Sequence, residues 1–138
     1  MQPNKCDAVN LHFRDYKNRK KGFSMLTRDE LPACPVATTV RLVGNKWKLL
    51  ILRNLFVGPN RFGELIHTIP GISQKVLTDN LRSMEQDGIL IRTAYAEVPP
   101  RVEYKLSELG DTMRPIIAAM ETWGRNYQEV VKRASEKA

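Results

Sequence analysis

The stretch from Ile72 to Gly88 constrains the fold of this chain more than any other. Ser73 is a favourable N-cap residue, because its hydroxyl can accept a hydrogen bond from a first-turn amide. Ile72 and Leu77 stand at the two positions of a hydrophobic staple, and Gly88 suits the left-handed residue that ends many helices. One apolar stripe recurs at four- and three-residue spacing and consists of Leu77, Leu81 and Met84. The stretch therefore predicts an amphipathic helix.

The other face of this predicted helix is polar. It carries Gln74, Lys75, Thr78, Asp79 and Arg82. Side chains of these types match the donors and acceptors that reach base edges and phosphates in a DNA major groove. The plainer interpretation is the solvated face of an ordinary amphipathic helix, so the neighbouring segments have to decide between the two.

The segment before this helix predicts three shorter helices. Their expected ranges are Val36–Val43, Asn45 to Gly58, and Gly63 to about Thr68. Pro35 suits the first position of a helix, Asn45 is a good N-cap, and Pro70-Gly71 forces a tight turn. Two short helices joined by such a turn, the second with a polar outer face, predict a helix-turn-helix.

After Gly88 the apolar period changes from that of a helix to that of a strand. Ile89, Ile91, Thr93 and Tyr95 alternate with Leu90, Arg92 and Ala94, and Val102, Tyr104 and Leu106 alternate with Arg101, Glu103 and Lys105. These runs predict a hairpin with a proline-stiffened tip over residues 98–101. The expected fold class is therefore mainly α with a small β-hairpin, a winged helix-turn-helix.

Ser107 is the expected N-cap of one last helix that runs to the end of the chain. Its apolar stripe is wider than the core of so small a domain can cover, which predicts a homodimer interface at Met113, Ile116, Ile117, Met120, Trp123 and Tyr127. In the alternative, residues 1–30 fold back over the stripe. We thus expect a basic extension (1–30), a winged helix-turn-helix domain (31–107) and a C-terminal dimerisation helix (108–138).

The charge of the chain is unevenly distributed. The net charge is +7 with a pI of about 9.6, which suits a polyanionic partner. Residues 1–28 carry seven basic residues against Asp7 and Asp15, so most of the excess lies in these residues. The extension to which they belong is either a solvated tail or an arm that touches DNA phosphate. With no long apolar run and no signal-peptide pattern, we expect a cytoplasmic protein with no membrane partner.

The residues resemble the HxlR-type winged helix-turn-helix regulators of bacteria and archaea, which are relatives of the MarR-like group. The resemblance covers about residues 34–127 and is carried by Cys34-Pro35, Gly44–Trp47, Gly58–Leu65, Pro70–Leu77, Asp87–Ile89 and Pro99–Gly110. It implies a homodimer that binds an imperfectly palindromic operator and represses or activates nearby genes. In several members the cysteine that matches Cys34 senses oxidants, quinones or aldehydes.

Docked as a dimer, the two recognition helices would lie in successive major grooves about 34 Å apart or a multiple of that. We expect Gln74, Lys75, Thr78 and Arg82 to face the groove. Ser73, through its amide, and Arg61 are expected at phosphate. Arg101 on the wing is expected either at phosphate or in the adjacent minor groove. Asp79 is expected either to pair with Lys75 or Arg82, or to accept a hydrogen bond from a cytosine.

Cys34 precedes a helix start, where the dipole favours a thiolate that an oxidant or a quinone could modify. The alternative is a small buried residue that packs the first helix. Cys6 is the other cysteine, and two cysteines make no disulfide framework.

Other classes of function fit the sequence less well. His12 and His67 are the only histidines, and nothing brings a base and a nucleophile together, so no catalytic residues, cofactor or metal site are expected. A winged helix that binds other proteins without touching DNA is the main alternative function. A small-molecule pocket beside the last helix is a further option.

Overall fold

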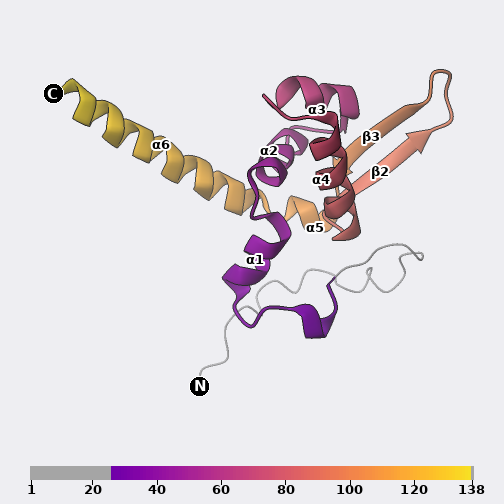
Figure 1. The fold of residues 1–138 in the computed structure, drawn as a ribbon, viewed down its shortest axis with the longest axis horizontal. Coiled ribbons are helices and arrows are strands. Elements are labelled where there is room, and N and C mark those ends of the chain that lie inside the picture. Colours follow the sequence, from indigo (N-terminus) through magenta and orange to yellow (C-terminus); the bar gives the residue numbers. More distant parts are fainter. Residues whose placement is uncertain (1–25, 138) are drawn as a thin grey trace.

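The computed structural model describes residues 26–137. Its elements, in chain order, are the 3-10 turn η2 (Arg28–Glu30), α1 (Pro35–Val43), α2 (Lys46–Leu55), β1 (Asn60–Arg61), α3 (Phe62–Thr68), α4 (Gln74–Gln86), β2 (Leu90–Tyr95), β3 (Arg101–Leu106), α5 (Glu108–Asp111) and α6 (Arg114–Glu136) (Figure 1). The predicted class, mainly helical with a small sheet, is confirmed, and α3, its turn and α4 form the predicted helix-turn-helix.

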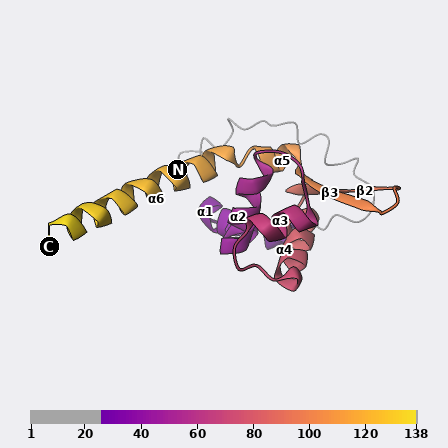
Figure 2. The ribbon, with the colours of Figure 1, turned by 90° about the horizontal axis from the view of Figure 1, so that it is seen from above.

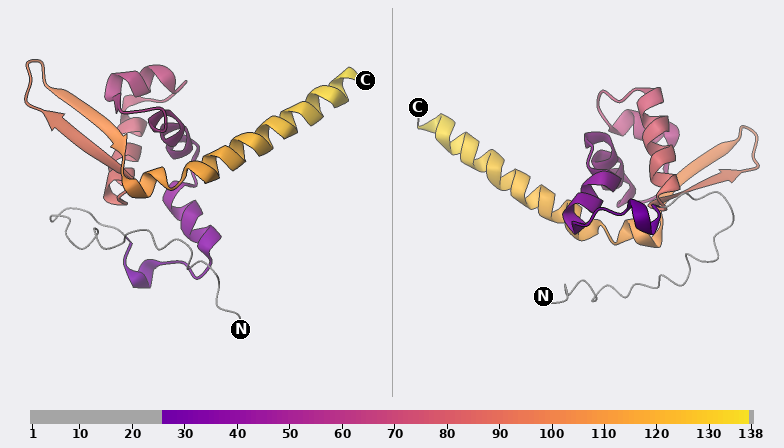
Figure 3. Two further views of the ribbon diagram at one scale, coloured as in Figure 1. Left: turned by 180° about the vertical axis from the view of Figure 1, so that it is seen from behind. Right: turned by 60° about the horizontal axis from the view of Figure 1, so that its bottom comes forward.

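The sheet has three antiparallel strands in the order β1-β3-β2. The hairpin pairs Leu90 with Leu106 at its base and Tyr95 with Arg101 at its far end. The two-residue strand β1 adds to β3, with Asn60 opposite Tyr104, and so attaches the start of the helix-turn-helix to the wing. The hairpin projects from the body as a wing in all views (Figures 1 and 3).

The core lies where α2, α3 and α4 meet the base of the sheet. Its fully buried side chains include Ile51, Leu52, Leu65, Ile69, Leu77, Leu81, Met84, Ile89 and Leu90. The three apolar residues of α4 are all among them, so the predicted stripe is confirmed. Burying such side chains contributes about 1.5–3 kcal/mol each, which fixes how α4 is rotated about its axis.

The helix caps expected from the sequence are present. The Asn45 side chain accepts from the Lys48 amide at 2.8 Å, and the Ser73 hydroxyl accepts from the Val76 amide at 3.1 Å. Gly71 in the turn and Gly88 after α4 have φ of 79° and 78°, the left-handed conformation that glycine adopts without strain.

The C-terminal segment is two helices rather than the single helix that the sequence pattern predicted. The buried Ser107 hydroxyl accepts from the Gly110 amide at 3.0 Å and donates to the Ile89 carbonyl at 2.9 Å, which docks α5 against the sheet. A new helix starts at Arg114, because Pro115 has no amide hydrogen and its ring would clash with the carbonyl of Asp111 in a continuous helix.

Helix α6 leaves the body and extends as a long arm (Figure 2). Within residues 26–137, only its first turns contact the rest of the protomer. The Arg114 guanidinium donates to the Phe56 carbonyl at 3.0 Å and lies over the Phe56 ring, and Ile117 packs against the core.

A buried lysine joins three helices, and the sequence pattern gave no reason to expect it. The Lys48 ammonium, on α2, donates to the Ser83 hydroxyl of α4 at 2.8 Å and to the Leu42 carbonyl of α1 at 3.3 Å. Next to α4, burial raises the pKa of Asp87, while the charges of Lys48 and Arg41 oppose that rise. The polar back of α4 is therefore fixed to both preceding helices.

We predict that Ser83→Ala lowers the free energy of unfolding by about 1–3 kcal/mol, because Lys48 loses one of its two partners where water scarcely reaches. Adding Lys48→Met should recover part of this loss, since the charge is then removed with its partner. Urea denaturation of the parent and both variants measures the effect. A double variant less stable than Ser83→Ala would contradict this account of the lysine.

Candidate nucleic-acid interface

The outer face of α4 is accessible. Gln74, Lys75, Asp79 and Arg82 are exposed, and Thr78 is half-buried. The Lys75 ammonium lies 3.9 Å from the Asp79 carboxylate, so Lys75 is the partner found for this acidic residue. Both side chains are mostly solvent-exposed, and such a pair is weak enough to open for another ligand.

The first turn of α4 has free amides rather than a free hydroxyl. The Ser73 hydroxyl is occupied as the helix cap. The next two amides, of Gln74 and Lys75, have no carbonyl partner within the helix because of their position in its first turn. This end of the 13-residue helix can therefore offer backbone N–H groups to an anion.

Thr78 has less to offer than its position in the sequence suggested. Its hydroxyl donates to the Gln74 carbonyl at 2.8 Å, one turn back in the same helix. This back-bonding is common for threonine in helices, and it leaves the methyl group and an oxygen lone pair for contacts with a ligand.

Arg101 lies at the far end of the wing, next to its tip, and its guanidinium is already engaged within the hairpin. It is the first residue of β3, and its guanidinium is held by Glu103 at 2.7 Å and by Glu97 at 2.9 Å, over the ring of Tyr95. A guanidinium clamped by two carboxylates braces the end of the hairpin. The exposed tip consists instead of Val98, Pro99 and Pro100.

Arg61 is exposed at the junction of β1 and α3. Its backbone amide donates to the Glu64 carboxylate at 3.2 Å, so the backbone is fixed while the guanidinium stays accessible. This placement is compatible with the phosphate contact expected from the sequence.

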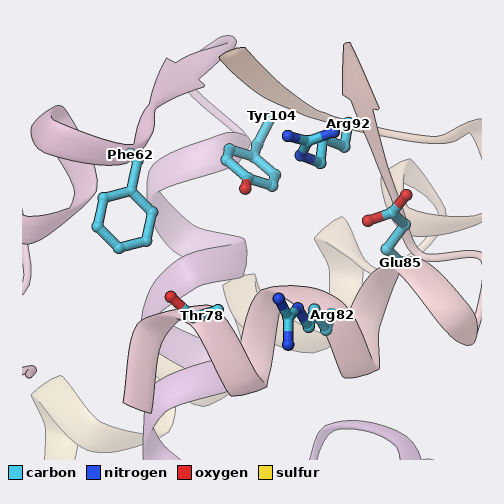
Figure 4. A pocket seen from close by; sticks show the side chains of 6 residues that line it. All are labelled: Phe62, Thr78, Arg82, Glu85, Arg92 and Tyr104. Atoms are coloured by element: carbon cyan, nitrogen blue, oxygen red, sulfur yellow. The ribbon is translucent and has the colours of Figure 1, made fainter. Parts of the chain in front are cut away.

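A cavity of about 450 Å³ lies between α4 and the sheet. It is lined by Phe62, Thr78, Arg82, Glu85, Arg92 and Tyr104 (Figure 4). In the sequence Arg92 is a polar residue of an alternating strand, and that pattern alone assigns it no role in binding. Its cross-strand pairing with Tyr104 would have been the signal, because directly paired residues share one face of a sheet.

The apolar face of α6 is uncovered within the described part of the chain. Trp123 and Tyr127 stack with ring centroids 5.5 Å apart and are 69% and 58% exposed. Ile116 and Met120 continue this face, and Ile117 is half-buried against the core. Met113 does not belong to it: it is 9% exposed and packs in the core, because it lies in the turn that docks α5 and α6 on the body.

Cys34 is exposed, as the residue that precedes α1 at its N-cap position. The alternative of a buried cysteine that packs the first helix is therefore wrong for this protomer. Cys6, His12 and most of the basic extension lie outside the described residues. The alternative in which the extension folds back over the apolar stripe of α6 also falls on those residues.

Residues 26–137 contain neither a cluster of metal ligands nor a membrane-spanning helix. No three His, Cys, Asp or Glu side chains gather there as a metal site requires. No helix in that range combines the length and apolar composition needed to cross a membrane.

A three-stranded wing behind a helix-turn-helix, with the second helix presenting a polar face, defines a winged helix-turn-helix protein. The chain belongs to the HxlR-like helix-turn-helix family, whose model matches residues 42–132. It is a transcriptional regulator of the helix-turn-helix type, and the members it matches are regulators rather than enzymes.

Its relatives include the HTH-type transcriptional regulator YdeP of Bacillus subtilis, with 41% identity over 88% of this chain and 96% of that protein. An HTH-type regulator of Methanothermobacter thermautotrophicus is 43% identical over 80% of this chain and 84% of its own. Among solved structures, the redox regulator HypR in its reduced form has a TM-score of 0.68 and 40% identity, over 72% of this chain and 99% of that chain. The diamide-treated YodB of B. subtilis has a TM-score of 0.58 and 37% identity, over 68% and 94%.

Proposed function

We propose that this regulator is a homodimer that binds a pseudo-palindromic DNA operator sequence-specifically, in the cytoplasm where the DNA lies, to repress or activate transcription. The observation that carries the proposal is the accessible polar face of α4 on a helix whose opposite side is fully buried. A buried stripe holds the helix rigid, so its outward side chains meet a duplex without first being ordered.

In this proposal α4 lies in the major groove with its N-terminal residues at the base edges. Gln74 is the adenine-reading candidate and Lys75 the guanine-reading one, each worth about 1–3 kcal/mol of discrimination. The free amides next to Ser73, together with Arg61, hold phosphates. Thr78 contributes its methyl group, and Arg82 faces the duplex two turns after Lys75.

We predict that Gln74→Ala changes the base preferred at one position of each half-site, because the bidentate contact is lost while the phosphate contacts remain. Selection of binding sites from random duplexes, with the parent and the variant, measures this. Gln86→Ala is the matched control, since Gln86 is exposed at the far end of the same helix. An unchanged selected sequence for Gln74→Ala would remove this residue from the reading set.

The dimer is proposed to form through α6. Among the described residues, α6 touches the body only at its start, and its exposed, stacked aromatic pair is apolar surface that a second copy can cover. Ile116, Ile117, Met120, Trp123 and Tyr127 form this surface, and Val130 and Val131 extend it at 64% and 48% exposure. A second copy also supplies the second recognition helix that a palindromic operator requires.

We predict that the parent protein sediments as a dimer and that Trp123→Asp shifts it to monomer, because a carboxylate would have to be buried in an apolar interface. Analytical ultracentrifugation over a micromolar range measures the change. Arg125→Asp is the control on the other side of α6, where Arg125 pairs with Glu121. A parent protein that is monomeric at micromolar concentration would refute the dimer.

Regulation is proposed to act through Cys34. The thiol is exposed beside the N-terminus of a nine-residue helix, and two solved relatives are named as a redox regulator and as a diamide-treated regulator. Attack of the Cys34 thiolate on a peroxide O–O bond yields a sulfenic acid and releases hydroxide, or an alcohol after protonation. With an electrophile such as a quinone, the thiolate sulfur would instead attack a ring carbon and form a covalent adduct.

We predict that mild peroxide or diamide changes the DNA affinity of the parent protein and leaves that of Cys34→Ser unchanged. Mass spectrometry of the same samples should locate the modification on Cys34. Cys6→Ser serves as the matched control. If affinity changes while Cys34 stays unmodified, this cysteine is not the sensor.

A further inference from the structure

We propose that the cavity between α4 and the sheet is the seat of one backbone phosphate of the bound duplex, held by Arg82 and Arg92. This inference rests on the proposed DNA binding and deepens it. It adds Arg92 to the interface and changes the role of Arg82 from reading a base to holding a phosphate.

The two guanidinium groups reach one space from two different elements. Arg82 is on α4, in a row with Thr78 and Glu85 at helical spacing. Arg92 is on β2 directly opposite Tyr104 of β3, so both point from the same face of the sheet. Figure 4 shows Thr78 and Arg82 below the cavity, Glu85 at its side, and Arg92 with Tyr104 above it.

Neither arginine is neutralised within residues 26–137. Arg101, Arg114 and Arg125 each make an ion pair with a carboxylate there, whereas Arg82 and Arg92 make none, although Glu85 lines the same cavity. The charged side chains that line the cavity are Arg82, Arg92 and Glu85, so their net charge is +1. The two guanidinium groups thus line one cavity, and neither forms an ion pair with the Glu85 carboxylate beside them.

The remaining lining suits a phosphodiester. The Tyr104 side chain is buried, its hydroxyl has no hydrogen-bond partner in the described part of the chain, and its oxygen points into the cavity in Figure 4. It can act as a third donor beside two guanidinium forks, the geometry that phosphate oxygens accept best. Phe62 forms an apolar wall against which a deoxyribose can pack.

The position of the cavity selects DNA backbone over a free anion. The row that starts with the proposed base-reading Gln74 continues through Thr78 and Arg82 to Glu85, so it runs from the groove-facing end of α4 into the cavity. Recognition helices read bases with their N-terminal residues. The later residues of the same row would then lie toward the DNA strand that borders the groove. Its phosphate would lie where the two arginines converge.

The test measures DNA affinity against salt for the parent dimer, Arg92→Ala, Arg82→Ala and the control Arg53→Ala, whose arginine is exposed on α2 away from the cavity. We expect both cavity variants to lose about tenfold in affinity for the selected operator and for unrelated duplexes alike, and the salt slope to fall by about 0.9. The selected sequence should stay unchanged, and Arg53→Ala should alter neither value. Glu85→Gln should tighten binding.

A second measurement identifies the phosphate itself. Operators that carry a single neutral methylphosphonate at successive positions should weaken parent binding at one position per half-site. At that position Arg92→Ala should lose no further affinity, because the charge that it contacts is already absent. If the affinity loss from the methylphosphonate and the affinity loss from Arg92→Ala add at every position, no backbone phosphate is bound in the cavity. Thermal melting confirms that each variant is folded.

The outcomes separate the inference from the proposed function. A parent protein with no salt-dependent duplex binding overturns both. Duplex binding by the parent, with affinity and salt slope unchanged in Arg92→Ala, overturns the phosphate seat alone. If inorganic phosphate raises the melting temperature of the parent but not of Arg92→Ala, and DNA affinity is the same for both, then the cavity binds a free anion and the inference is wrong.

Discussion

The burial of one side of α4 is the constraint on which the rest of this structure depends. Leu77, Leu81 and Met84 are almost fully buried against α2 and the base of the sheet. Turning the helix by one residue about its axis would expose part of this stripe and bury a charged residue, a change of several kcal/mol. The polar face of α4 points outward because its apolar face is buried in the core.

Polar contacts then limit how far that helix can move. Lys48 bonds to Ser83 on the inner side of α4, and Asn45 donates to Asn80 at 3.1 Å, so α4 is tied to the start of α2 and the end of α1. Cys34 lies at the other end of α1. One nine-residue helix therefore separates Cys34 from the Leu42 carbonyl that the Lys48 ammonium binds.

The distribution of arginines separates the braced parts of the surface from those that can receive a ligand. Arginine–carboxylate pairs hold the wing at Arg101 and the helix junction at Arg114. Beside α4, Arg82 and Arg92 line a cavity and form no ion pair within the described residues, although Glu85 lines the same cavity. Residues 29–138 together carry only a small net positive charge, so such a local concentration of charge is what attracts a polyanion.

Most of the fold could be predicted from the sequence, because the signals are local: the Ser73 cap, the turn at Gly71, the apolar spacing in α4 and the period-two strands each act within a few residues. Pro115 is also a local signal, for the break before α6, but the apolar stripe continues past this proline and so favoured one continuous helix. Only the tertiary structure paired Arg92 with Tyr104 across the sheet and placed both beside α4, and only it clamped Arg101 between two carboxylates. Glu97 and Glu103 are near Arg101 in the sequence, but the closed hairpin is what brings both carboxylates to one guanidinium. Arg92, Tyr104 and the residues of α4 come from separate elements, and spacing along the chain carries no information about which distant side chains will meet.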